Sequence, residues 1–102
     1  MAWGTPAEIE RRRRIRLAVW AYAYEKLNES LVDDHTFDAE AKLIDLTVAT
    51  GHQQLDLWFR SNFTPDTGLW VNRHPGARRL HQIATQIIKD RSAAWPDPVT
   101  ST

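Results

Sequence analysis

Three acidic side chains, Glu25, Asp34 and Asp38, could carry chemistry where two predicted helices meet. If the two helices pack side by side, these carboxylates could bind a ribose, an amide or a metal ion. Helix capping and the helix dipole also favour acidic residues at the start of a helix, and neither requires a ligand. The pattern therefore predicts either a small polar binding site or an ordinary capped helix end.

Five arginines form the sharpest charge feature of the sequence. Four are consecutive, from residue 11 to residue 14, and Arg16 follows. Successive residues of an α-helix are rotated by about 100°, so the run surrounds the helix and some members must lie beside the core. Arg11 and Arg14 share one side, as do Arg12 and Arg16. We expect either a solvated helix start, neutralised in part by nearby glutamates, or a partner-binding patch for nucleic acid or an acidic protein surface.

The segment from residue 63 to residue 70 combines turn residues with two aromatic ones. Pro65, Asp66 and Gly68 are typical of a turn, and Phe63 and Trp70 flank it. Exposed tryptophans often anchor protein interfaces, which makes Asp66 and Trp70 candidate partner-binding residues. The two rings could equally clamp the loop onto the core.

No set of residues in the sequence is typical of catalysis or of metal binding. The chain has no cysteine, and its serines lack the Gly-x-Ser-x-Gly context and an adjacent histidine. The pairs His52/Asp56 and His74/His81 could each share a helical face, but a zinc site usually needs three or four ligands. We therefore predict no catalytic residue, no metal and no cofactor.

Helical patterns that would position these residues account for most of the chain. The segment Thr5-Pro6-Ala7-Glu8 is a capping box with proline at the first helical position. Apolar residues at helical spacing continue the pattern in a second segment, at residues 37, 41, 44 and 48. We predict helices over residues 6–28, 34–49, 52–62 and about 77–91. On the third of these, Asp56 and Arg60 are expected to point outward as an i, i+4 pair.

These segments predict a mostly α-helical fold that begins with an antiparallel helical hairpin. A turn or extended segment is expected near residues 63–72, because Leu69, Trp70 and Val71 have strand-like composition. Residues 1–92 should form a single domain of about four helices. Residues 93–102 should form a flexible tail, with Trp95 as its one possible anchor.

The charge of the chain is balanced overall but not along its length. Thirteen basic and thirteen acidic groups cancel, whereas residues 31–70 carry seven acidic groups and two basic ones. Proteins that coat DNA usually have a basic excess, so direct binding to nucleic acid is expected to be weak. No apolar run approaches the roughly 18 residues that span a bilayer. We expect no membrane contact and a cytoplasmic location, which the absence of cysteine suits.

Residues 22–38 carry a first resemblance. The stretches YAYEKLN at 22–28 and LVDDHTFD at 31–38 resemble the helical N-terminal module of NAD-dependent DNA ligases. That module holds the nicotinamide half of NAD, and the resemblance implies that Tyr24, Asp34 and Asp38 could bind this cofactor. Glu25 replaces the histidine of the ligase pattern and Phe37 replaces its second tyrosine. Because the adenylating lysine and the other ligase domains are absent, the chain is not expected to be a ligase.

A second resemblance covers most of the chain. The stretches IRLAVWAYAYE at 15–25, FTPDTGLW at 63–70 and HP at 74–75 resemble small accessory proteins of tailed phages and prophages. Such proteins commonly bind and redirect or inhibit host machinery, including CRISPR effector complexes, and would work in the host cytoplasm.

We therefore expect a non-catalytic protein-binding module, in the form of a phage-encoded inhibitor or modulator of a host nucleic-acid or defence complex. A nicotinamide-nucleotide binder and a nucleic-acid-binding accessory protein that uses the arginine run are the alternatives. The partner and the oligomeric state stay open.

Overall fold

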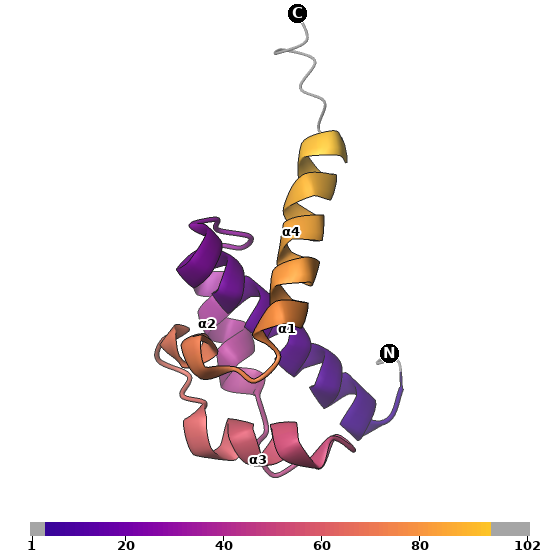
Figure 1. The fold of residues 1–102 in the computed structure, drawn as a ribbon. Coiled ribbons are helices and arrows are strands. Elements are labelled where there is room, and N and C mark those ends of the chain that lie inside the picture. Colours follow the sequence, from indigo (N-terminus) through magenta and orange to yellow (C-terminus); the bar gives the residue numbers. More distant parts are fainter. Residues whose placement is uncertain (1–3, 95–102) are drawn as a thin grey trace, which may run out of the picture.

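The computed structural model describes residues 4–94 and shows a mostly helical fold (Figure 1). The elements are α1 (Pro6–Leu27), α2 (Asp34–Leu43), α3 (Gln53–Asn62), the 3₁₀ helix η1 (Leu69–Arg73) and α4 (Ala77–Ala94). No strand occurs between residues 4 and 94. The predicted fold class, a small helical domain with about four α-helices, is confirmed.

The start of α1 is fixed by the predicted capping box. The Thr5 hydroxyl accepts a hydrogen bond from the backbone N–H of Glu8 at 3.2 Å, and the Glu8 carboxylate accepts one from the N–H of Thr5 at 2.8 Å. The helix ends at Asn28, whose φ of 54° turns the chain away from the helix axis. The helix predicted over residues 6–28 is thus confirmed.

The first two helices form the predicted antiparallel hairpin. Arg16 donates to the Glu40 carboxylate at 2.6 Å, and Arg13 donates to the carbonyl of Leu43 at 3.2 Å. The residue nearer the start of α1 therefore contacts the residue nearer the end of α2, as antiparallel packing requires. This hairpin places the C-terminal half of α1 opposite the first turns of α2.

The prediction that the second helix reaches residue 49 is wrong, because α2 ends at Leu43. The Arg14 guanidinium binds the carbonyls of Asp45 and Val48 at 2.7 and 3.1 Å, which removes them from a helical ladder. The Asp45 carboxylate accepts hydrogen bonds from both the backbone N–H and the hydroxyl of Thr47. These contacts stabilise a turn in place of the last helical turns.

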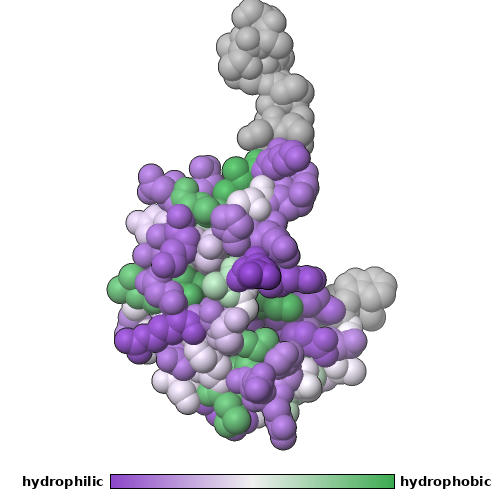
Figure 2. Space-filling model, in the orientation of Figure 1, coloured by the Kyte–Doolittle hydropathy of each residue, from purple (hydrophilic) through white to green (hydrophobic). Residues whose placement is uncertain are grey.

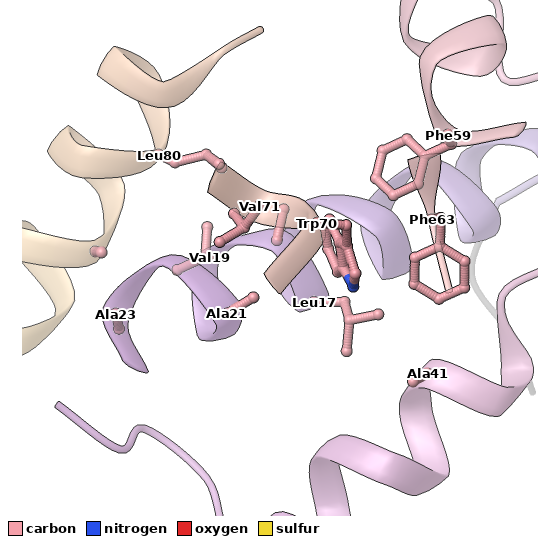
Figure 3. Close-up of a cluster of buried hydrophobic side chains, with 12 residues drawn as sticks. Leu17, Val19, Ala21, Ala23, Ala41, Phe59, Phe63, Trp70, Val71 and Leu80 are labelled. Atoms are coloured by element: carbon pink, nitrogen blue, oxygen red, sulfur yellow. The ribbon is translucent and has the colours of Figure 1, made fainter. Parts of the chain in front are cut away.

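The core lies where α1 meets η1, α3 and α4 (Figure 3). Small residues of α1 allow close packing, and larger ones from the later elements cover them. The fully or nearly buried residues are Leu17, Ala18, Val19, Ala21, Ala23, Ala41, Phe59, Phe63, Trp70, Val71, Leu80 and Ala84. Leu80 and Ala84 of α4 complete this core.

Within the turn or extended segment predicted near residues 63–72, a turn occurs at residues 65–66, whereas the stretch with strand-like composition is helical. Leu69–Arg73 forms a single 3₁₀ stretch, in which Trp70 and Val71 are both buried and Leu69 is exposed. The Trp70 ring lies 5.2 Å from the Phe63 ring and 5.6 Å from the Phe59 ring. A tight helical turn directs two adjacent bulky side chains into the core, which an alternating strand cannot do.

The far end of α4 projects from the rest of the molecule (Figure 1). This helix continues to Ala94, so it includes the first two residues of the predicted tail. Residues 95–102, including the predicted anchor Trp95, lie outside the described residues. No helix between residues 4 and 94 is long and apolar enough to cross a membrane. On the face drawn in Figure 2, hydrophobic residues form small separate groups among hydrophilic ones.

Candidate functional site

A pocket of about 320 Å³ lies at the end of the α1–α2 hairpin where the connection joins the two helices. Its walls are the C-terminal half of α1, the connection to α2, the first turns of α2 and the loop before η1. The lining residues are Trp20, Ala21, Tyr24, Glu25, Ser30, Leu31, Val32, Asp34, Phe37, Asp38, Asp66, Thr67 and Gly68. The residues of the ligase-like pattern and the predicted loop residue Asp66 therefore meet at one site.

Three aromatic rings contribute to the pocket wall. Trp20 and Tyr24 are one helical turn apart on α1 and share a face, and Phe37 approaches from α2. Phe37 packs against the core, whereas Tyr24 is 59% exposed. An exposed tyrosine and a half-buried tryptophan on one wall offer aromatic ring surface on which a planar group can stack.

Gly68 allows the loop before η1 to close this side of the pocket. A Cβ at this position would lie 3.2 Å from the Cβ of Ala21 and 3.5 Å from the ring of Phe37. Its close approach brings the neighbouring Asp66 and Thr67 against the hairpin.

Four carboxylates line the pocket, those of Glu25, Asp34, Asp38 and Asp66. Within residues 4–91, none of them has a hydrogen bond or an ion pair with another side chain or with the backbone. Most other acidic groups of this part of the chain are bound: Glu8, Glu10, Asp33, Glu40, Asp45, Asp56 and Asp90 all have partners. Glu29 is the other unpartnered carboxylate there, and it lies outside the pocket.

Helix capping explains only part of this acidic group. The N-cap of α2 is Asp33, whose carboxylate accepts a hydrogen bond from the backbone N–H of Thr36 at 2.7 Å. That hydrogen bond lowers the pKa of Asp33 below its usual value. The helix dipole accounts for Asp34 in the first turn. Asp38 lies one turn further along α2, where neither capping nor the helix dipole explains an acidic residue. Binding of a ligand therefore remains an explanation for Asp38.

The four carboxylates do not form a metal site. In the described part of the chain, no three His, Cys, Asp or Glu side chains are placed to hold a metal ion. The acidic groups are instead distributed around the pocket wall, an arrangement that suits a larger organic cation.

The arginine run does not form one binding patch. Arg14 is 5% exposed and donates to Glu10 at 2.8 Å and to Asp56 at 2.9 Å. Arg16 is bound to Glu40, while Arg11 and Arg12 lie at the surface. The buried Arg14 is therefore unavailable to a partner, and its role is to tie α1 to the start of α3.

The prediction that Asp56 points outward is wrong, because this side chain is only 7% exposed. Burial alone would raise the pKa of Asp56. The hydroxyl and backbone N–H of Thr50, at 2.6 and 2.9 Å, and the Arg14 guanidinium outweigh burial and hold that pKa below its usual value. Arg60, its expected partner, donates instead to the carbonyl of Leu46.

The two loop residues predicted to bind a partner separate in the structure. Asp66 is exposed and lines the pocket, whereas Trp70 is 5% exposed and packs in the core. Trp70 therefore clamps the loop and offers no surface anchor. Trp20 was not among the predicted site residues, although its spacing of four from Tyr24 could have identified it.

Comparison of the chain with protein-family models, with curated proteins and with solved structures gives no match.

Proposed function

We propose that the chain is a non-catalytic protein-binding module that engages its partner through the pocket between α1 and α2. One observation carries this proposal: of the five described carboxylates without a partner, four surround this pocket together with three aromatic rings. Asp34 and Asp38 are one helical turn apart on α2, where like charges are unfavourable to the folded chain. A partner with a positively charged group would relieve that repulsion and gain affinity from it.

A protein partner is favoured over nucleic acid on the same grounds. Phosphates would be repelled by the acidic pocket, and three of the arginines of the run, Arg13, Arg14 and Arg16, are bound within the molecule. The expected host partner and the role of a phage-encoded inhibitor or modulator rest on the resemblance of residues 15–75 to phage accessory proteins.

A nicotinamide nucleotide is the second candidate, because Tyr24, Asp34 and Asp38 line one pocket. Against it, Glu25 and Asp66 add negative charge beside a ligand that carries phosphate, and Phe37 cannot donate the hydrogen bond of a tyrosine. We expect no heat in titration calorimetry with nicotinamide mononucleotide or NAD at up to about 1 mM. Binding that Asp34→Ala or Tyr24→Ala abolishes would favour the nucleotide instead.

Affinity capture with matched baits tests the protein-binding function. The baits are the wild-type chain, the pocket variant Glu25→Gln/Asp38→Asn and the control Glu29→Gln/Asp90→Asn, in which two carboxylates outside the pocket are neutralised. We expect at least one protein from a bacterial lysate to bind the wild type and the control but not the pocket variant. If every captured protein also binds the pocket variant, the pocket is not the interaction site and the proposal fails.

A further inference from the structure

We infer that the pocket binds the side chain of an arginine that a partner protein presents. The inference rests on the proposed function, and it adds the chemical group that the pocket recognises. Its support comes from the way the chain binds two of its own arginines.

Arg16 shows how the hairpin surface holds a guanidinium group. It donates to the Glu40 carboxylate at 2.6 Å, and its Cζ lies 5.8 Å from the centre of the Trp20 ring. A carboxylate accepts the N–H groups while an aromatic face contacts the planar cation, a combination that suits arginine. Because Trp20 also lines the pocket, this arrangement lies directly beside it.

Arg14 repeats the arrangement inside the molecule. Its guanidinium donates to Glu10 and Asp56 at 2.8 and 2.9 Å, and its Cζ lies 5.4 Å from the centre of the Phe59 ring. The chain thus uses the same partners, carboxylate and ring, for a buried arginine and for an exposed one.

The pocket presents the same partners without an arginine. Along the hairpin, Arg13 and Arg16 of α1 both lie within ion-pair distance of Glu40 of α2. Closer to the connection between the two helices, α1 contributes Trp20 and Tyr24 while α2 contributes Asp38 and Asp34. No basic residue lines the pocket. An arginine from a partner could therefore pair with the carboxylates of α2 there, as Arg13 and Arg16 pair with Glu40.

Size and the spread of charge favour a guanidinium over a metal ion or an ammonium group. A volume of about 320 Å³ is small for a ligand pocket, for which roughly 300–1,000 Å³ is usual. A guanidinium has five N–H donors in one plane and can reach several separated carboxylates while it stacks on a ring. The lysine ammonium is a more compact and more strongly hydrated point charge, which matches this geometry less well.

Titration of the ¹⁵N-labelled chain with blocked amino acids tests the inference. The probes are N-acetyl-arginine amide, the corresponding citrulline amide, which has nearly the same shape without the charge, and the corresponding lysine amide. We expect the arginine probe to shift the backbone signals of residues 20–38 and 66–68, with a dissociation constant of about 1–10 mM. The citrulline probe should cause no saturable shift, and the lysine probe should bind at least about threefold more weakly than the arginine probe.

Variants then locate the site. Glu25→Gln/Asp38→Asn should weaken binding of the arginine probe about tenfold or more, because hydrogen bonds to charged groups are lost. Tyr24→Ala should also weaken it, whereas Glu29→Gln/Asp90→Asn should bind as the wild type does. The amide spectrum of each variant reports whether it is folded. Tyr24, Asp38, Glu29 and Asp90 are exposed, and Glu25 is half-buried.

Several results would overturn the inference: no saturable shift with the arginine probe, equal binding of the citrulline or lysine probe, or unchanged binding to the pocket variant. If affinity capture yields a pocket-dependent protein but the arginine probe does not bind, the inference fails and the proposed function stands. If the arginine probe binds but every captured protein also binds the pocket variant, the proposed function fails.

Discussion

The imidazole of His74 connects η1 to α4. Its Nδ1 accepts a hydrogen bond from the backbone N–H of Gly76 at 2.9 Å, and its ring lies 5.0 Å from the ring of Trp58. Burial lowers its pKa from 6.5 to about 4. A proton on Nδ1 would remove the acceptor and place a charge beside the aromatic core, so the folded chain holds this histidine neutral.

We therefore predict that stability falls as the pH decreases from 6.5 toward 4. In this range the unfolded chain protonates His74 and the folded chain does not, so the unfolded state binds more protons. The stability contributed by the neutral form is complete above pH 6.5. Melting temperatures between pH 7.5 and pH 5, where most carboxylates stay ionised, measure the effect. His74→Asn should flatten this dependence, while His35→Gln, a change at an exposed histidine, should preserve the wild-type profile; identical profiles for all three chains would contradict the prediction.

Residue type indicated which side chains could form a binding site. Tertiary contacts determine which of them line the pocket and which are buried. The sequence showed that some arginines must lie beside the core, but not that Arg14 would be the buried one. Asp56 was predicted to be exposed because its spacing from Arg60 fits a surface pair. The contact that buries it joins residues 42 positions apart, and no local pattern reports such a pairing. Asp34 and Asp38 could be grouped with Glu25 from their place where two predicted helices meet, whereas Tyr24 could be added only through the ligase resemblance.

At the scale of elements, the starts of helices follow from local sequence better than their ends. The capping box predicted the start of α1 correctly, because all of its hydrogen bonds lie within four residues. The end of α2 depends instead on Arg14 of another helix, which binds the carbonyls that further helical turns would use. The same limit applies to η1, where burial of two adjacent residues overrides their preference for strands.

Asn28 is the element-scale position where backbone geometry matters most. Its φ of 54° and ψ of 39° place it in the left-handed region, and the turn that it makes starts the pocket-lining connection to α2. We predict that Asn28→Gly retains the stability of the wild type, because glycine adopts this conformation without strain. Asn28→Val should cost about 1–2 kcal/mol, since a β-branched residue is disfavoured there. Urea denaturation measures both variants, and equal stability of the valine variant would show that the turn can adopt another conformation.

At the scale of the whole molecule, zero net charge conceals a local excess. Basic groups near both ends of the sequence balance the acidic middle, yet the pocket carboxylates have no cation as a partner within residues 4–91. Sites that bind a charged partner commonly hold several groups of like charge, whose mutual repulsion lowers the stability of the free protein. The same charges that are proposed to attract a partner should therefore make the free chain less stable.

We predict that Glu25→Gln/Asp38→Asn melts at a higher temperature than the wild type. A relief of repulsion between a few exposed charges corresponds to a gain of about 2–5 °C at 10 mM NaCl for a domain of this size. Because exposed charges are screened over about 10 Å at 0.1 M salt, the gain should fall to less than half at 300 mM NaCl. Taking the difference between variant and wild type at each salt concentration cancels the screening of pairs that both share, such as Arg16 with Glu40. The control Glu29→Gln/Asp90→Asn removes the same net charge outside the pocket and should gain clearly less. Equal gains in the two variants, or a gain that salt does not reduce, would mean that the pocket carboxylates do not repel one another in the free chain.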